Sequence, residues 1–499
     1  MLVILSDLHL TDGSSAVTVS GEAFEIFARR LQESAEAAGW RADGYYRPID
    51  RIDIVLLGDI LDVIGSMRWS CQSQVRPWHD PQTSEFVDQV ARITGDVLQH
   101  NEQALAMVRG LAGEGGVTVP PALRTGRPAV EAEGTPVAVK VHYVVGNRDW
   151  VYQLPGPKYD ALRQKVIDRM GLANRGDAPF PHDFTESEEL LQAMRRHKVA
   201  ARHGDLFDPF SFEGDRRASS LGDAIVVELV NRFAFEVETR WANELPAGAV
   251  VGLREIDNVR PLLLIPVWID GLLERTCPMP AIRKQVKEVW DRLVDEFLAI
   301  DFVRRQEAWG PTDLVDGLRR ALRFSKRPSA GWASAVADWF NRLRGAPDGS
   351  YYHHALGEQD FRNRRARHVV YGHTHLAESV PLDASYAEGY VLNQMYFNAG
   401  TWRRVHRQTR LAPAEHEFIA SDAMTYLVFF QGDERKGRPY ETWSGTLGFN
   451  PSEVTIHRID PGRPSHASGQ PVSPPGLHTH APHFPAPSHQ PRVVPDRRV

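Results

Sequence analysis

The chain has 499 residues, of which 42% are hydrophobic and 24% are charged, and its formal net charge is -6. These values are typical of a globular protein with a sizeable core, and they exclude a fibrous or wholly disordered chain. The negative balance disfavours a general nucleic-acid coat protein, although local basic patches remain open. The only cysteines are Cys71 and Cys277, so any metal must be held by His, Asp, Asn or Glu. So few cysteines fit a reducing compartment, and we expect a cytoplasmic protein.

The chain begins with an apolar run, MLVILSDLHL, which has no basic lead and reaches Asp7 and His9 almost at once. This pattern argues against a signal peptide and predicts a first strand. The longest apolar patch, residues 261–273, is interrupted by Pro266 and Asp270 and is too short to cross a membrane. We therefore expect no transmembrane segment. The patch could line a lipid pocket, pack inside the protein or touch a membrane peripherally.

Five short apolar runs are predicted to be buried strands, and each ends in polar residues. In chain order these runs begin at Leu2, Ile52, Val139, Lys198 and Arg367. Their length and β-branched content are typical of a layered α/β protein, in which ligands bind at the C-terminal ends of the strands. The polar residues at these ends are Asp7 with His9, Asp59 with Asp62, Asn147 with Arg148 and Asp149, His203 with Asp205, and His373 with His375.

Segments with helical periodicity separate the strands, notably residues 21–40 and 84–113. Later β-like runs, YVLNQMYFNAGTW, AMTYLVFFQ and EVTIHRI, are predicted to complete a second sheet. The predicted organisation is a core at residues 1–64, 136–205 and 367–459, a helical insertion at 65–135, an inserted helical cap at 206–366, and a Pro- and His-rich tail at 460–499. The tail is predicted to be disordered, and its histidines, among them His478, His480 and His483, fit a solvated segment better than a metal site.

The polar strand ends together form a set of oxygen and imidazole ligands without a thiolate. Such a set suits divalent manganese, iron or zinc. In an extended Asp-x-His or His-x-His step the two side chains point to the same face, so we expect each pair to reach one site. Each element alone also fits an ordinary turn or helix cap, but five of them in one order, each after an apolar strand, favour a metal centre.

The ordered motifs SDLH, GDILD, GNRD, a lone His and GHTH resemble the calcineurin-like metallophosphoesterase superfamily. The resemblance covers the strands from Leu2 to about Trp402, where NAGTW also fits the family. It implies a four-layer β-sandwich flanked by helices and a centre of two divalent ions, with manganese favoured over iron or zinc. The implied ligands are Asp7, His9 and His375 for the first ion, Asn147, His203 and His373 for the second, and Asp59 as the bridge.

Arg148 stands where the superfamily usually has a histidine that protonates the leaving group. Arginine cannot act as a general acid near neutral pH, but it can hold phosphate oxygens through a fork of donors. The change favours a leaving group that needs no proton, such as a phosphate released from a pyrophosphate. GNRDW, HGDLFD and GHTH together resemble UDP-2,3-diacylglucosamine pyrophosphatases, although the cap from Leu206 to Ala366 is longer here and the insertion between Gly65 and about Pro136 is additional. A plain turn residue with a surface ion pair is the alternative for Arg148.

The resulting prediction is a metallophosphoesterase that hydrolyses a phosphodiester or pyrophosphate bond with metal-activated water. Asn147 and Arg148 are expected to stabilise phosphoryl oxygens, and Asp62, Asp149 and Asp205 are expected to orient the imidazole ligands. The expected partner is a phosphate-containing small molecule or nucleotide-linked substrate. A nuclease, which basic runs in the cap would suit, and a cyclic-nucleotide phosphodiesterase are alternatives in the same superfamily. A scaffold without catalysis is the third alternative, which the complete ligand set disfavours.

Overall fold

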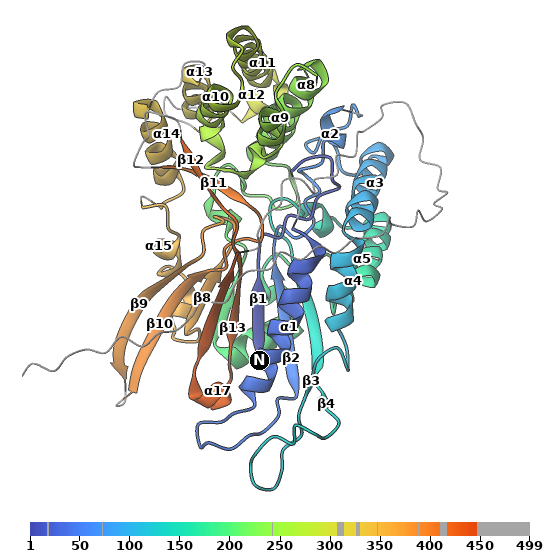
Figure 1. Ribbon diagram of the computed structural model, residues 1–499, viewed down its shortest axis with the longest axis vertical. Coiled ribbons are helices and arrows are strands. Elements are labelled where there is room, and N and C mark those ends of the chain that lie inside the picture. The colour runs from blue at the N-terminus through green and yellow to red at the C-terminus, as the bar shows by residue number, and fades with distance from the viewer. Residues whose placement is uncertain are drawn as a thin grey trace, which may run out of the picture. The chain divides into compact units, whose positions relative to one another are not determined.

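The computed structural model describes residues 1–446, except for residues 17–18, 72, 242, 307–313, 326–329, 347, 388–389 and 410–416. The chain divides into two compact units, Met1–His457 and Arg458–Val499. The second unit lies outside the described residues, as do the predicted strand EVTIHRI and the tail histidines. The first unit is a mixed α/β structure, as the strand and helix patterns predict (Figure 1).

A five-stranded sheet carries the first three predicted strands. Its order is β14 (Tyr440–Gly445), β13 (Met424–Phe429), β1 (Leu2–Leu5), β2 (Arg51–Leu57) and β5 (Ala138–Val144). The strands β1, β2 and β5 are parallel, whereas β13 runs antiparallel to β1. The parallel strands are largely buried, and β1 is a continuous apolar run, as expected where both faces of a sheet are covered.

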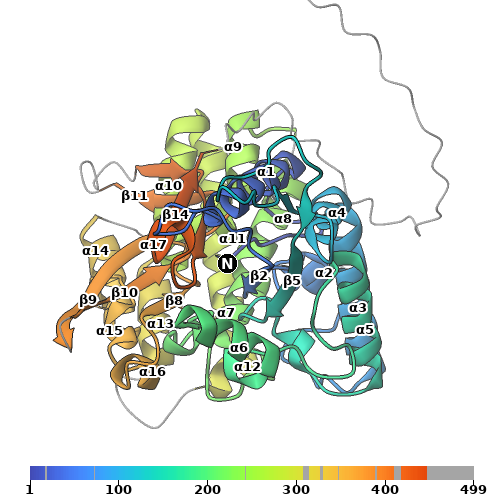
Figure 2. The ribbon, with the colours of Figure 1, turned by 90° about the horizontal axis from the view of Figure 1, so that it is seen from below.

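A four-stranded sheet carries the other two predicted strands, in the order β6 (Val199–Ala201), β8 (His368–Tyr371), β10 (Tyr390–Asn398) and β9 (Glu378–Ala387). The prediction that the run at residues 423–431 belongs to a second sheet is wrong, because β13 pairs with β1 instead. The two sheets share a core in which Ile4 and Val55 of the first pack with Val370 and Phe397 of the second. Figure 2 shows the two sheets from the end at which the N-terminus lies.

Helices cover the outer faces of the two sheets. On the first sheet lie α1 (Gly21–Ala38), α3 (Ser84–His100), α4 (Glu102–Leu111) and α5 (Pro157–Met170). The predicted helical stretch 84–113 divides at Asn101, whose side-chain amide donates to the carbonyls of Thr11 and Val97 at 2.7 and 2.8 Å. On the second sheet, the short helix α15 (Tyr352–Ala355) packs against Tyr371 through Ala355. Tyr351, which directly precedes this helix, packs against Tyr371 as well.

Several shorter elements of the first unit, all outside the helical segment 206–366, connect these layers. They are α2 (Arg68–Cys71), β3 (Thr118–Val119), β4 (Thr135–Pro136), η1 (Trp150–Gln153), η2 (Phe184–Glu186), α6 (Glu188–His197), η3 (Asp205–Phe207) and α17 (Glu434–Gly437). The predicted insertion 65–135 therefore contains helices and a small hairpin of β3 and β4.

Residues 206–366 are mainly helical and have an apolar core of their own, which includes Phe233, Trp290 and Phe297. The helices are α7 (Leu221–Ala224), the π-helix η4 (Ile225–Asn231), α8 (Arg232–Trp241), α9 (Ala247–Arg254), η5 (Ile256–Asn258), η6 (Leu262–Leu264), α10 (Ile265–Thr276), α11 (Pro280–Ala299), α12 (Asp301–Arg305), α13 (Leu314–Phe324), α14 (Ala330–Leu343), α15 and α16 (Gln359–Arg362). The apolar patch 261–273 forms η6 and most of α10, and most of its side chains are buried in this core. None of the described helices combines the length and apolar character needed to span a bilayer.

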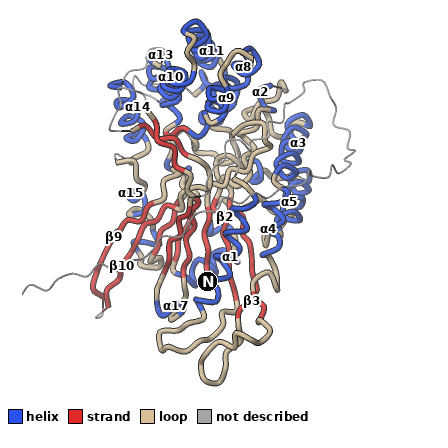
Figure 3. The backbone as a smooth tube through the Cα atoms, in the orientation of Figure 1, coloured by secondary structure: helices blue, strands red, loops and turns tan. Residues whose placement is uncertain are grey.

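The helical segment also contributes a strand. β7 (Val259–Arg260) pairs in parallel with β11 (Val405–Gln408), which pairs with β12 (Phe418–Ser421). Figure 3 shows these strands reaching toward the helices, with loops gathered between the helices and the large sheets. Through the backbone pairing of this small sheet, the helical segment is held against the part of the chain just after the predicted NAGTW motif.

One charged residue inside the first sheet gives a test of the fold. Asp53 on β2 is 1% exposed, and it accepts hydrogen bonds from Arg51, Arg196 and His142 at 2.6, 2.9 and 3.2 Å. Burial by itself raises the pKa of Asp53, but the hydrogen bonds from His142 and Arg51 outweigh it and hold the pKa well below its usual value. A lowered carboxyl pKa stabilises the fold above the unfolded-state pKa and loses that effect as the pH falls.

We predict that Asp53→Asn lowers the free energy of unfolding by about 2 kcal/mol at pH 7, because charged hydrogen bonds are lost in a buried position. The difference from wild type should shrink as the pH falls below about 4, because Asp53 then takes up a proton in the unfolded chain while the folded protein still resists protonation. Urea unfolding followed by circular dichroism measures both. Asp43→Asn, at the exposed pair with Arg47, is the control and should change little. An Asp53→Asn effect that stays constant down to pH 2 would contradict this account.

Candidate metal centre

The predicted ligands lie in loops that follow the strands, not in the strands themselves. The strands end at Leu5, Leu57, Val144, Ala201 and Tyr371. The expected extended geometry of the Asp-x-His and His-x-His steps is wrong. Asp7, His9, Asp59, His373 and His375 all have a positive φ, between 46° and 67°. Such a backbone costs about 1–3 kcal/mol for each residue and is found where surrounding structure imposes it, often at functional sites.

The loops after β1 and β2 impose this conformation because they stay hydrogen-bonded to each other. The backbone N–H of Asp7 donates to the Gly58 carbonyl at 3.1 Å, and that of His9 donates to the Asp59 carbonyl at 2.9 Å. Gly372 lets the loop after β8 approach closely, since a Cβ there would lie 2.0 Å from the Ser6 hydroxyl oxygen. The two sheets therefore present their loops to one place.

Two largely buried groups of side chains in these loops can each hold a metal ion. The first is Asp7, His9 and His375, and the second is Asp59, His203 and His373, and in each group the candidate ligand atoms lie within 4.8 Å of one another. These six residues come from all the predicted strand ends except that of β5. They are six of the seven residues that the resemblance assigns to two ions, and the seventh is Asn147.

In the first group the three donor atoms have the spacing of a coordination shell. His9 Nε2 lies 3.0 Å from His375 Nε2, and Asp7 Oδ1 lies 3.2 Å from His375 Nε2 and 3.7 Å from His9 Nε2. Ligand atoms about 2.1 Å from an ion lie about 3.0 Å apart at a right angle and about 3.4 Å apart at a tetrahedral angle. Asp7 Oδ1 is buried and has no hydrogen-bond partner among the described residues. A cation would satisfy it.

The other polar atoms of Asp7 and His9 already make hydrogen bonds, and these bonds hold the candidate ligand atoms in place. Asp7 Oδ2 accepts from the Ser6 hydroxyl at 2.6 Å and from the His373 backbone N–H at 2.9 Å. His9 Nδ1 donates to Asp62 Oδ2 at 3.0 Å, so its Nε2 faces the site unprotonated when a metal is bound. A carboxylate behind an imidazole in this way fixes its tautomer and makes it a better ligand.

The second group is ordered in the same way. His203 Nδ1 donates to the Leu57 carbonyl at 3.0 Å, and its Nε2 faces Asn147 Oδ1 at 3.3 Å. His373 Nε2 lies 3.0 Å from Asp208 Oδ2, which leaves Nδ1 as the ring nitrogen for a metal. Asn147 thus brings the end of β5 to the second group.

One carboxylate oxygen lies between the two groups. Asp59 Oδ2 is 3.7 Å from His9 Nε2 in the first group and 3.4 Å from His203 Nε2 in the second. The other oxygen of this carboxylate, Asp59 Oδ1, accepts a hydrogen bond from the backbone N–H of Arg148 at 2.7 Å. Asp59 is therefore the one carboxylate, among the described residues, placed to contact cations in both groups.

The electrostatic state of the site favours cation binding. Burial by itself lowers the pKa of His203, but Asp59 and Asp7 outweigh it and raise the pKa well above its usual value. The negative field that holds a proton on this imidazole also attracts a metal ion, which would displace that proton. The pKa of His375 is lowered well below its usual value by burial and by Arg260, so this ligand is neutral already.

Arg148 is buried, with 4% of its surface exposed, so the alternative of a surface turn residue is wrong. Its Nη2 donates to Asp257 Oδ1 at 3.1 Å, and its Nη1 lies 3.8 Å from Asp62 Oδ1. Nη1 is buried and has no hydrogen-bond partner among the described residues, although the group is charged, and Arg148 is one of the residues that line a cavity. A buried charged donor without a partner is costly unless a ligand satisfies it.

Two carboxylates do not have the role expected of them. Asp149 accepts hydrogen bonds from the Tyr143 hydroxyl and from the backbone N–H groups of Ile60 and Gly146. It therefore holds the loops together and does not orient an imidazole ligand. Burial raises its pKa to about 7, and the charge of Asp59 adds to the effect. Asp205 contacts His182, which belongs to neither group, at 3.2 Å.

Three residues of the site were missed at the sequence level. Asp208 closes the HGDLFD motif, three residues after Asp205, and this spacing was its only signal. Arg403 directly follows NAGTW, and its Nη1 lies 2.9 Å from Asp257 Oδ2 and 3.5 Å from Asp62 Oδ2. Asp257 lies in the helical segment, where no motif marks it.

A cavity of about 860 Å³ opens beside the two groups, between them and the helical segment. Its polar wall contains His9, Asp59, Asn147 and His373 together with the cations Arg148, Arg260, Arg344 and Arg407. Its other wall is apolar and includes Ile225, Val226, residues 262–264 and Phe340. The cavity thus has candidate metal ligands on its polar wall, arginine side chains beside them, and an apolar wall opposite.

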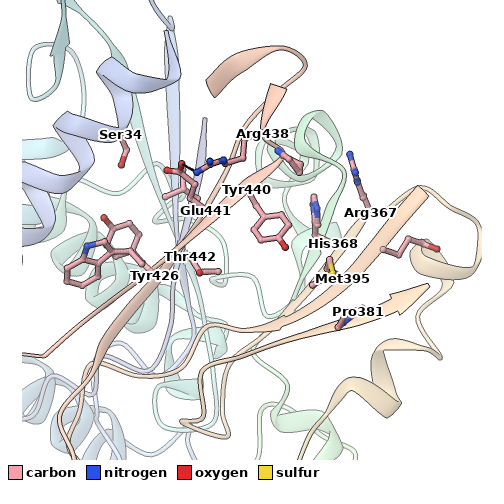
Figure 4. Close-up of a pocket in the computed structure, with 14 residues that line it drawn as sticks. Ser34, Arg367, His368, Pro381, Met395, Tyr426, Arg438, Tyr440, Glu441 and Thr442 are labelled. Atoms are coloured by element: carbon pink, nitrogen blue, oxygen red, sulfur yellow. Dashed lines mark hydrogen bonds and ion pairs between the residues drawn. The ribbon is translucent and has the colours of Figure 1, made fainter. Parts of the chain in front are cut away.

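A second cavity, of about 830 Å³, lies at the opposite end of β8. Its walls include His368, the first residue of that strand, and Tyr440, which lie side by side in Figure 4 with ring centroids 5.5 Å apart. Arg438 pairs there with Glu441 at 2.6 Å. None of the predicted site residues lines it, whereas several of them line the first cavity.

Comparison of the chain with known protein families gives no match, and comparison with curated proteins gives none either.

We predict that Asp59→Asn lowers the manganese content from two ions to at most one for each chain, because the shared carboxylate loses its charge. Inductively coupled plasma mass spectrometry of manganese-loaded, desalted protein measures the content. Asp53→Asn, which removes the charge of another buried carboxylate on β2, the strand that precedes Asp59, is the matched control and should retain two ions. Two ions in both variants would rule out a bridging role for Asp59.

Proposed function

We propose that the protein is a dinuclear metal-dependent phosphoesterase of the calcineurin-like metallophosphoesterase superfamily, which hydrolyses a phosphodiester or pyrophosphate bond. The observation that carries this proposal is the position of Asp59 Oδ2 between two groups of ligands, at 3.7 and 3.4 Å from an imidazole nitrogen of each. Two sheets with a shared core and helices outside both of them agree with the four-layer sandwich of that superfamily.

The donor set supports two borderline divalent cations. Imidazole nitrogens and carboxylate oxygens suit manganese, iron and zinc, and we favour manganese. Asp7, His9 and His375 would hold the first ion, and Asn147, His203 and His373 the second, with Asp59 shared. When bound, such a pair supplies Lewis-acid chemistry, since it lowers the pKa of water and offsets charge on phosphoryl oxygens.

The protein's own residues position the substrate and stabilise developing charge. The guanidinium of Arg148, whose Nη1 has no hydrogen-bond partner among the described residues, can donate to a phosphoryl oxygen, and Asn147 precedes it in the chain. Both line the cavity together with His9 and Asp59. Donors fixed in a buried site in advance stabilise a transition state more strongly than the same donors in water. Asp62 and Asp208 hold the rings of His9 and His373 in the ligand orientation.

A pyrophosphate is the favoured substrate bond. Burial by itself lowers the pKa of Arg148, but Asp257 and Asp62 outweigh it and raise the pKa further above its already high value, so the side chain cannot deliver a proton. A phosphate leaving group needs none, whereas an alkoxide does. The additional arginines in the cavity would suit a substrate with more than one phosphate. A nucleotide-linked pyrophosphate with an apolar group, as in the subgroup that the motifs resemble, fits both walls.

The direct test is a panel assay of manganese-loaded protein. The substrates are bis-p-nitrophenyl phosphate, nucleotide sugars, a UDP-linked lipid, a cyclic nucleotide and single-stranded DNA. We expect nucleotide-linked pyrophosphates to have the highest kcat/KM and expect chelation by EDTA to abolish turnover. Selective cleavage of DNA would overturn the pyrophosphatase preference, and no turnover of any substrate by protein with two bound ions would overturn the proposal.

A second prediction concerns Arg148 alone. Arg148→Ala should lower kcat for a nucleotide sugar by about 10²-fold, because one preorganised donor to the phosphoryl group is removed. Arg148→His should lower pyrophosphate turnover but raise the relative rate with a cyclic nucleotide, whose alkoxide needs a proton. Arg175→Ala, at an exposed pair with Asp177, is the control. Equal losses on every substrate in both Arg148 variants would show that the residue does not discriminate between leaving groups.

A further inference from the structure

Asp257 brings the helical segment into the metal centre. Its carboxylate is 2% exposed and lies between two guanidinium groups, with Oδ1 at 3.1 Å from Arg148 Nη2 and Oδ2 at 2.9 Å from Arg403 Nη1. Both arginines also approach Asp62, at 3.8 and 3.5 Å. Two cations and two carboxylates therefore alternate behind the first group of ligands.

The small sheet explains how a residue from the insertion reaches this position. β7 pairs with β11 so that Val259 lies opposite His406 and Arg260 lies opposite Arg407. Asp257 comes just before β7, and Arg403 comes just before β11. Arg260 Nη1 also donates to the Asp257 carbonyl at 2.6 Å, which fixes the backbone of the turn η5. The position of Asp257 is therefore set by backbone pairing and not by a flexible surface contact.

The contact determines how Arg148 is presented. An arginine side chain has many rotamers, and ordering it costs about 2 kcal/mol. Here Asp257 engages Nη2 of an arginine that lines the cavity, and Nη1 has no hydrogen-bond partner among the described residues. Without Asp257, Asp62 would be the only carboxylate shared by Arg148 and Arg403. It would draw Arg148 away from the cavity and compete with the hydrogen bond that orients His9.

We propose that Asp257 is a positioning residue that holds Arg148 ready to bind the phosphoryl group, so that the inserted helical segment completes the site instead of only covering it. This inference rests on the proposed function, because it assigns Arg148 to phosphoryl binding. It adds that a residue outside the metallophosphoesterase motifs is required for that binding.

The test compares Asp257→Asn with Asp422→Asn in the manganese-loaded full chain. Asp422 makes a bidentate pair with Arg404, at 2.6 Å for both contacts, so its variant breaks an Arg–Asp pair one residue from Arg403 but outside the site. For Asp257→Asn we expect a drop of about 10- to 100-fold in kcat/KM for a nucleotide sugar. We also expect a similar rise in the inhibition constant of inorganic phosphate, with two manganese ions retained. Asp422→Asn should match wild type in all three.

A double-mutant cycle separates positioning from general damage to the fold. In the Arg148→Ala background, Asp257→Asn should lower kcat/KM by less than about 3-fold, because the side chain that it positions is already absent. Asp257→Glu keeps the charge and should retain more activity than Asp257→Asn. It also serves as the second variant if the asparagine protein does not fold.

The outcomes separate this inference from the proposed function. If wild type hydrolyses the substrates and Asp257→Asn behaves like Asp422→Asn, the positioning role is wrong and the proposed function stands. Additive losses in the double variant also contradict the positioning role. If wild type with two ions neither hydrolyses the substrates nor binds phosphate, the proposed function fails and the inference fails with it.

Discussion

The loops that follow β1 and β2 remain hydrogen-bonded to each other past the last residue of each strand, and the metal centre depends on this pairing. It holds Asp7, His9 and Asp59 in a left-handed backbone, so that side chains from two neighbouring strand ends meet at one place. The apolar packing of the two buried sheets on either side offsets the cost of this backbone strain. A site built in this way is rigid before any ligand binds, which favours electrostatic catalysis.

The charges behind the ligands form a second constraint. Asp62 orients His9 while it is itself held between Arg148 and Arg403, and Asp257 closes the network from the helical segment. Burial by itself raises the pKa of Asp257, but Arg148 and Arg403 outweigh it and lower the pKa to about 2. A buried network of this kind is weak evidence for stability, because desolvation offsets the attraction. Its value lies in holding one arginine donor and one imidazole in fixed positions.

Strands, helices and the residues that meet in the two candidate groups could be predicted from the sequence, because apolar runs ending in polar residues are local patterns. The local backbone could not be predicted in the same way. The extended step assumed for Asp7 and His9 was wrong because pairing with the neighbouring loop, and not local preference, determines their φ. Asp149 and Asp205 are close in sequence to candidate ligands, yet they contact Tyr143 and His182. Asp257 has no local signal at all, since only the pairing of β7 with β11 brings it to Arg403.

The most direct measurement is anomalous X-ray scattering at the manganese edge from crystals of the manganese-loaded protein. The account predicts two peaks beside the Asp59 carboxylate, one contacting Asp7, His9 and His375 and the other contacting Asn147, His203 and His373. A single peak, or peaks held by other side chains, would contradict it.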